Sequence, residues 1–543
     1  MFTNIIKPFL KKGLITSEVV DVPNLGILYE YRGVPFASKS TQRWAAPVPI
    51  EKLDKKLNEK LNLGHHPPAC YQKGEDIKMD EYCFYLNIYK PPVPARFKLP
   101  IVVWFQENNN QIGLKKITAV DFGELALMAN VIIITVQYRL NIFGFFHYRD
   151  QFTGNYGLLD QRLALEFISN NRDNLGGDKL IITGHGSGAM SVGYHLLSAS
   201  TELFAGAICH SGVPLFDGHI SSVDEVDQAL YQMDLSDKSD PVNYARLLDA
   251  DALFTAFSNA TASLAWGPVG DDGAFFESDA VAKLRTADID SRKKPLMIGT
   301  VSFDGSSFIR DAVFTHDNFK EKVFGHIRGD FGGVKYGHIE SEHEDAIIDK
   351  YLTSFHGDEF HKQLFFDLDK HELKLLAGYI LSDKAYHLPS SEFAEIYRKS
   401  DGTVYHYYID VQPEFDYYLD QPVQYHGCGH SMEMFYLFGR PKSRIDSGVS
   451  KHAFDKWESK FSDFLGGIYN EFCHNFHFDS HKKLKQWQPS GTLFVTNNAT
   501  HILTELKPGR TRALVLLEMF FDRIKTRNSI LEQCNPPRRG VGA

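Results

Sequence analysis

Residues 181–192, with the sequence IITGHGSGAMSV, decide the fold of this chain. Ile181, Ile182 and Thr183 are β-branched, and with the preceding leucine they predict a short strand. The residues GHGSG that follow are rich in glycine and predict a tight turn. The residues after Gly188 are small or apolar and continue as a helix. The stretch therefore predicts a strand, a sharp turn and a helix.

The turn has the layout of a nucleophile elbow, Gly-x-Ser-x-Gly, in which a strained turn between strand and helix exposes a serine above the sheet. Gly184 and Gly188 occupy the two glycine positions. The residue between them, where the nucleophile belongs, is Gly186. Ser187 lies one position too late, because a frame centred on it loses both flanking glycines. The pattern therefore indicates an elbow that lacks its nucleophilic serine.

Apolar, β-branched segments alternate with helical segments along the chain. The predicted strands are residues 99–105, 131–136, 180–183, 295–300, 403–409 and 492–495, and the predicted helices before the elbow are 122–129 and 160–170. This alternation predicts an α/β fold with an open, mostly parallel central sheet flanked by helices. Two stretches, 235–251 and 315–362, are predicted to be surface insertions.

The composition is that of an ordinary globular protein. Of the 543 residues, 43% are hydrophobic and 23% are charged, which is enough apolar material for a sizeable core. The 58 basic residues against 68 acidic residues give a net charge of −10, without any block of like charge. An acidic chain without a basic patch disfavours the binding of nucleic acid or of an anionic membrane.

The sequence favours the cytoplasm over the extracellular alternative. The N-terminal segment carries Lys7, Lys11 and Lys12 in its apolar stretch, so no secretory signal is predicted. The longest apolar run, residues 131–136, is far too short for a transmembrane segment. If the chain is secreted, Asn259 and Asn498 stand in Asn-x-Thr sequons and become candidate glycosylation sites.

Several motifs resemble the type B carboxylesterases, the family that includes the cholinesterases and the non-catalytic neuroligins. The matching stretches are YRGVPFA at 31–37, EYCFYLNIY at 81–89, GNYGLLDQ at 154–161 and GGD at 176–178. The resemblance runs over residues 14–527 and implies one α/β-hydrolase domain with a mixed central sheet. Residues 1–13 are then an N-terminal extension, and residues 528–543 are a flexible tail.

The resemblance also implies the positions of an active site. The family uses a serine, an acidic residue and a histidine in that chain order. Its acid motif aligns with residues 303–306 and places Asp304, one methylene shorter than the usual glutamate, at the acidic position. Its His-Gly-x-Glu motif aligns with residues 430–433 and places His430 at the base position. With Gly186 at the nucleophile position, Asp304 and His430 are the remnants of a catalytic triad.

The loop that supplies the oxyanion donors is altered as well. The family's His-Gly-Gly-Gly-Phe aligns with QENNN at residues 106–110, where no glycine is left. Glu107 and Asn108 then stand at oxyanion positions of the loop, and Ser187 stands at the oxyanion position after the elbow. Glycine lets backbone N–H groups approach a substrate closely, whereas Glu107 adds bulk and negative charge where negative charge develops. Together with Gly186, this loop implies a catalytically inactive protein that acts by binding.

The roles of Ser187 and of two cysteines each allow two interpretations. Ser187 is either a displaced nucleophile or a small residue packed under the helix. Cys70 and Cys83 match the family's first disulfide, while a reducing compartment would leave both as thiols. Cys209, on an apolar strand, is predicted to be a core thiol. The histidines show no metal-ligand spacing, and no metal or cofactor is expected.

Two classes of function remain open. Neuroligins carry glycine at the same elbow position and use the fold as an interaction surface, so a protein partner or a small apolar ligand is expected. The alternative is a carboxylic ester hydrolase with residual or rerouted activity that uses His430 and Asp304. The apolar segment 512–521 is wider than one helical stripe, and the family pairs through helices at this end, which implies a homodimer. Burial of this helix on two sides is the competing interpretation.

Overall fold

The computed structural model describes residues 18–22, 25–50, 67–72, 78–94, 96–106, 122–148, 151–214, 227, 230–231, 233–235, 240–260, 267–269, 273–276, 284, 289, 294–310, 312–325, 341–354, 365–413, 415–416, 421–422, 427–438, 456–479, 484–489, 491–496 and 500–503. Across these residues one large sheet of eleven strands runs in the spatial order β1-β2-β3-β5-β4-β8-β9-β10-β11-β14-β15. Its strands are β1 Glu18–Val22, β2 Gly26–Pro35, β3 Tyr85–Lys90, β4 Leu99–Phe105, β5 Ile132–Val136, β8 Gly177–His185, β9 Gly206–His210, β10 Leu296–Val301, β11 Val404–Asp410, β14 Thr492–Thr496 and β15 Thr500–Leu503.

The sheet is mixed, with its parallel part in the centre. The strands from β5 to β14 in the spatial order pair in parallel. Antiparallel pairs lie at both edges, where β1, β2, β3 and β5 meet on one side and β14 meets β15 on the other. The predicted α/β fold with a mostly parallel sheet is therefore confirmed.

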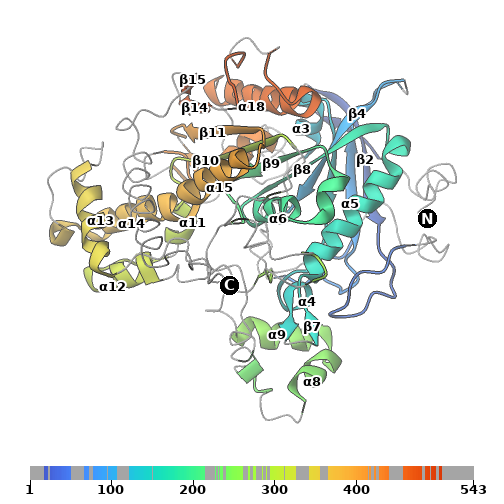
Figure 1. The fold of residues 1–543 in the computed structure, drawn as a ribbon, viewed down its shortest axis with the longest axis horizontal. Helices are drawn as coiled ribbons and strands as arrows, with labels where there is room; N and C mark the ends of the chain where they lie inside the picture. The colour runs from blue at the N-terminus through green and yellow to red at the C-terminus, as the bar shows by residue number, and fades with distance from the viewer. Residues whose placement is uncertain are drawn as a thin grey trace, which may run out of the picture.

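Helices cover both faces of the sheet, so its central strands are apolar on both sides. On β4, Ile101 and Val103 join one hydrophobic core, while Val102 and Trp104 join another, because successive side chains point to opposite faces. The first core includes side chains of α5 Tyr156–Leu175, α6 Ser187–Leu196 and α15 Leu388–Lys399. The second includes side chains of α3 Phe122–Met128, α16 Met432–Phe438 and α18 Lys456–Asn475. Figure 1 shows α18 and α3 on one side of the sheet and α5 and α6 on the other.

A third core lies in a helical lobe beside the sheet, which Figure 1 shows mostly in yellow. The lobe is built from α11 Ser306–Ile309, α12 His316–Lys320, η3 Glu321–Gly325, α13 Ser341–Ser354, α14 Lys370–Ser382 and η5 Asp383–His387. Phe319, Val323 and Ile348 are buried in it. The prediction of a surface insertion at 315–362 is wrong for its described part, because these side chains pack against α14 and form a core.

Short elements connect these layers. They are α4 Asn141–Phe145, β6 His147–Tyr148, β7 Phe152–Thr153, η2 Ala199–Leu203, α8 Pro241–Leu247, α9 Ala250–Ala260, η4 Phe365–Asp367, β12 Phe415–Asp416 and β13 Gln421–Pro422. Val242 and Ala245 of α8 are buried in the first core, so the second predicted insertion, 235–251, is also partly internal.

Several predicted features lie outside the described residues. These are the extension 1–13, Glu107 and Asn108, Asn498, the segment 512–521 and the tail 528–543. Among the helices that the structure describes, none is long and apolar enough to cross a membrane.

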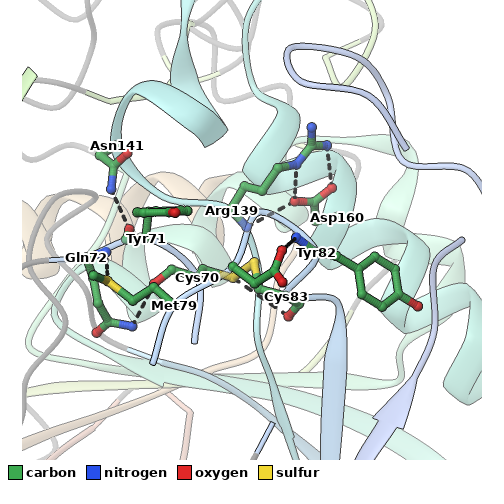
Figure 2. The surroundings of a disulfide bond; sticks show 10 residues. Cys70, Tyr71, Gln72, Met79, Tyr82, Cys83, Arg139, Asn141 and Asp160 are labelled. Atoms are coloured by element: carbon green, nitrogen blue, oxygen red, sulfur yellow. Dashed lines mark hydrogen bonds and ion pairs between the residues drawn. A yellow bond between two sulfur atoms is a disulfide. The ribbon is translucent and has the colours of Figure 1, made fainter. Parts of the chain in front are cut away.

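Of the two alternatives left open for Cys70 and Cys83, the structure has the disulfide. Cys70 and Cys83 are joined by an S–S bond of 2.01 Å, with their Cα atoms 5.0 Å apart. Figure 2 shows the bridge beside the ion pair of Arg139 and Asp160. The bridge ties the segment before β3 to the start of that strand and so anchors the antiparallel side of the sheet.

The ion pair of Arg139 and Asp160 joins the segment after β5 to the first turns of α5. Arg139 Nη2 lies 2.6 Å from Asp160 Oδ1, and Arg139 Nε donates to Oδ2 at 2.8 Å. Arg139 Nη2 also donates to the carbonyl of Ala45 at 2.9 Å. Burial raises the pKa of Asp160, and the charge and hydrogen bonds of Arg139 oppose that rise. The pair holds three segments together in a place with little water.

We predict that Asp160→Asn lowers the free energy of unfolding by about 3 to 5 kcal/mol, because it leaves a buried guanidinium without its counter-charge. The Arg139 side chain is only 5% exposed. Asp173→Asn is the matched control, since it breaks an exposed ion pair with Lys98. The Asp173 side chain is 72% exposed and the Lys98 side chain is 53% exposed. It should leave stability essentially unchanged. Urea denaturation of both variants measures the difference, and equal losses would contradict the prediction.

Candidate functional site

The turn between β8 and α6 has the predicted strand–turn–helix form. β8 ends at His185 and α6 begins at Ser187, with Gly186 between them at φ 54° and ψ −121°. Residues with a side chain rarely adopt such a positive φ. The Gly186 N–H donates to the carbonyl of His210 at 2.9 Å, and its carbonyl accepts from the Met190 N–H at 3.0 Å. Hydrogen bonds at both the N–H and the carbonyl of Gly186 therefore hold the turn in place.

Glycines around the turn allow backbones to touch. A Cβ on Gly188 would lie 2.2 Å from the carbonyl oxygen of Phe105, at the end of β4. A Cβ on Gly184 would lie 2.4 Å from the carbonyl carbon of Gly188. A Cβ on Gly212 would lie 2.1 Å from the carbonyl oxygen of Gly186. No real side chain approaches so closely, so the ends of β4, β8 and β9 meet here through main chain alone.

The structure brings Asp304 and His430 together, although they are 126 residues apart. Asp304 follows β10, His430 precedes α16, and His430 Nδ1 donates to Asp304 Oδ1 at 2.8 Å. Asp304 Oδ2 accepts from Ser211 Oγ at 2.8 Å and from the Val301 N–H at 3.1 Å. With Nδ1 used as a donor, a neutral His430 keeps Nε2 as its basic nitrogen. This arrangement can orient an imidazole as a proton acceptor.

A second imidazole lies beside this pair. The ring of His185 is 4.6 Å from the ring of His430, centroid to centroid. His185 Nε2 lies 3.6 Å from Glu433 Oε1, and His185 Nδ1 is hydrogen-bonded to Ser431 Oγ at 3.4 Å. Burial raises the pKa of Glu433, an effect that His185 and His430 oppose and that Asp304 reinforces. The sequence did not predict this group, although Ser431 stands where the family motif has glycine.

The remaining predicted residues are placed as follows. Ser187 is buried at the first position of α6, and Asn259 is exposed near the end of α9. Cys209 is a core thiol as predicted, and burial raises its pKa. Within the described part of the chain, no group of three or more histidine, cysteine or acidic residues is placed to hold a metal ion.

His210, the last residue of β9, is another buried polar side chain near the turn. Its two ring nitrogens are hydrogen-bonded to the hydroxyl groups of Tyr407 and Tyr469. Burial lowers the pKa of His210 to about 3, with a smaller contribution from His185. His210 is therefore neutral, so one tyrosine donates to it and the other accepts from it.

Comparisons with known proteins agree with this architecture. A model of the carboxylesterase family matches residues 9–515. The chain belongs to the carboxylesterase family, so its sheet and helices form an α/β-hydrolase fold.

Its relatives include enzymes and a neuroligin-like protein. The chain is 29% identical to acetylcholinesterase of Bungarus fasciatus over 456 residues, which is 77% of this chain and 70% of that protein. It is 43% identical to neuroligin-like protein glit-1 of Caenorhabditis elegans over 202 residues, 34% of this chain and 27% of that protein. It is 38% identical to liver carboxylesterase 1 of Oryctolagus cuniculus over 210 residues, 34% and 36% of the two chains. In the last two matches the chain spans about a third of the relative's length.

Next to the site, His387 of η5 is held between two acceptors. Its Nδ1 donates to Asp383 Oδ1 at 2.6 Å and its Nε2 donates to the Val301 carbonyl at 2.8 Å, which requires a proton on both nitrogens. Burial lowers the pKa of His387, but Asp383, Asp304 and the Val301 carbonyl raise it more, so the net pKa lies above its ordinary value. Val301 thus lies between His387 and Asp304, since its carbonyl accepts from His387 and its N–H donates to Asp304.

We predict that His387 makes the stability of the fold depend on pH. Its pKa is raised in the folded state, so its contribution is complete below the unfolded-state pKa of about 6.5 and is lost as pH rises through the folded-state value. His387→Gln should therefore lower the melting temperature more at pH 6 than at pH 9. His477→Gln, at a half-exposed side chain near Asp479, is the control and should change it little at either pH. An equal loss at both pH values for His387→Gln would refute the prediction.

Proposed function

We propose that this protein is a non-catalytic carboxylesterase-family member that acts by binding, with a protein partner or a small apolar ligand. Gly186 carries the proposal. It stands at the centre of the elbow, between β8 and α6, where the family's enzymes need a serine. Without a hydroxyl at this place, His430 has no nucleophile at the elbow to activate.

The altered oxyanion loop in the sequence supports the same proposal. Removal of the nucleophile of a serine protease lowers turnover on the order of 10⁶-fold. Removal of one oxyanion donor lowers it on the order of 10²–10³-fold. Gly186 and the glycine-free loop at Glu107 and Asn108 affect both parts of the catalytic machinery, so residual turnover by the family's ordinary route should be negligible.

The binding role rests on the intact scaffold. The elbow, the acid–histidine pair and the disulfide are all well packed, so the fold has not decayed with the loss of the serine. The match to neuroligin-like protein glit-1 supports a protein partner. The disulfide supports the extracellular alternative over the cytoplasm, because disulfides persist in oxidising compartments. Homodimer formation through residues 512–521 stays a prediction.

The second candidate function is a carboxylic ester hydrolase with rerouted chemistry. The hydrogen bond between Asp304 and His430 favours it, since an oriented imidazole can remove a proton from a water molecule. General-base assistance of this kind contributes about 10²–10⁴-fold, which suits only highly reactive esters.

We predict that turnover of short-chain p-nitrophenyl esters is at least about a thousandfold below that of an active homologue. Steady-state kinetics on the purified protein measure it, with His430→Ala as the control for contaminating esterases. Normal turnover that disappears in His430→Ala would overturn the non-catalytic assignment.

We predict that Gly186→Ser alone does not restore normal esterase activity, because the oxyanion loop remains altered. The serine would also have to adopt a φ near 54°, which costs about 1 to 3 kcal/mol. Adding glycine at Glu107, Asn108 and Asn109 should raise activity more than the sum of the separate changes, because parts of one catalytic unit are non-additive. A competent esterase from the single substitution would show that the loop is not a defect.

A further inference from the structure

We infer that Ser431, His185 and Glu433 form a second serine–histidine–acid group, in which Ser431 is a nucleophile that reacts once with activated acyl or phosphonyl compounds. The three side chains come from two places in the chain, the end of β8 and the start of α16. The inference goes beyond the proposed function, since a single covalent reaction needs no turnover.

The contacts define a role for each group. Ser431 Oγ lies 3.4 Å from His185 Nδ1, and His185 Nε2 lies 3.6 Å from Glu433 Oε1. With Nε2–H facing the carboxyl group, Nδ1 is the acceptor and can take the serine proton. The 3.6 Å separation is longer than a hydrogen bond, so it is the ionised form of Glu433 that stabilises the imidazolium, through its charge. Burial raises the pKa of Glu433 to about 7, so labelling should be faster above neutral pH.

The backbone of Ser431 gives an independent reason to expect a function. Its φ is 65°, in the left-handed region that glycine adopts freely and serine does not. The family's histidine motif has glycine at this position, so the serine is a departure that adds backbone strain. Strained residues of this kind cluster at functional sites. Here the strain places the hydroxyl group against His185.

Aromatic rings pack between this group and the protein surface. Phe308 is 38% exposed, and its ring is 5.8 Å from the ring of Tyr386. Tyr386 lies 4.9 Å from His430, and His430 lies 4.6 Å from His185. Ser431 is 2% exposed and His185 is fully buried, so a reactive compound reaches the hydroxyl group only when the neighbouring rings move aside.

The reaction balances without a cofactor. With a fluorophosphonate, Ser431 Oγ bonds to phosphorus, the P–F bond breaks and fluoride leaves, while the serine proton passes to His185 and then to solvent. With an activated ester, Oγ bonds to the carbonyl carbon, the C–O bond to the leaving group breaks, and His185 returns the proton to the departing oxygen. Only good leaving groups are expected to react, because the altered loop offers the transition state little stabilisation.

The test is labelling of the purified, folded full chain with a fluorophosphonate probe, followed by peptide mapping by mass spectrometry. We expect one adduct per chain, on Ser431. Ser431→Gly should abolish it while keeping or raising the melting temperature, since glycine relieves the positive φ. His185→Gln should slow labelling about 10²-fold or more, because the general base is lost. Ser191→Ala is the matched control, since Ser191 is buried and its hydroxyl donates to a carbonyl rather than facing an imidazole, and it should label normally.

Three results would overturn the inference. They are the absence of an adduct in the folded protein, an adduct that survives Ser431→Gly, and labelling that depends on His430 but not on His185. The p-nitrophenyl ester assay tests the proposed function separately. Turnover there would overturn the non-catalytic assignment, whereas the site of the adduct decides the role of Ser431.

Discussion

The close approach of backbones around Gly186 is the constraint on which the centre of this protein depends. Gly184, Gly188 and Gly212 bring the ends of three parallel strands and the start of α6 into direct main-chain contact. A single methyl group at any of these positions would collide with backbone atoms that are themselves fixed in the sheet. The elbow therefore holds its shape whether or not a nucleophile is present. It also fixes the position of His185, the last residue of β8.

Buried charge dominates the space beside the elbow. Asp304 with His430 and Asp383 with His387 are hydrogen-bonded pairs, so each carboxylate accepts a short hydrogen bond from an imidazole. Glu433 differs, because neither of its oxygens has a hydrogen-bond partner among the described residues. Burial raises its pKa, and the imidazole of His185 lowers it. A buried carboxyl group without a hydrogen-bond partner is stabilised by the imidazole beside it. His185 therefore has a role in stability as well as in chemistry.

The sequence predicted the parts of the site that are encoded in local motifs. The strand and turn at residues 181–188 followed from composition, while the pairing of Cys70 with Cys83 followed from the family resemblance. The meeting of Asp304 with His430 was also implied by the family motifs. The group of His185, Ser431 and Glu433 was not predicted, because it joins two segments that no periodicity connects. The lobe core at Phe319 and Ile348 was missed because charged residues surround its apolar positions.

The chain differs from the family's motifs at Gly186 and at Ser431, and the two differences change backbone strain in opposite directions. At Gly186 the chain has glycine where an enzyme holds a serine at positive φ, so the turn is relaxed and the hydroxyl group is lost. At Ser431 it has serine at positive φ where the family motif has glycine, so strain appears and a hydroxyl group is gained. Both turns lie next to His185. A loss of function alone explains the first change but not the second, since decay has no reason to introduce strain beside a buried imidazole.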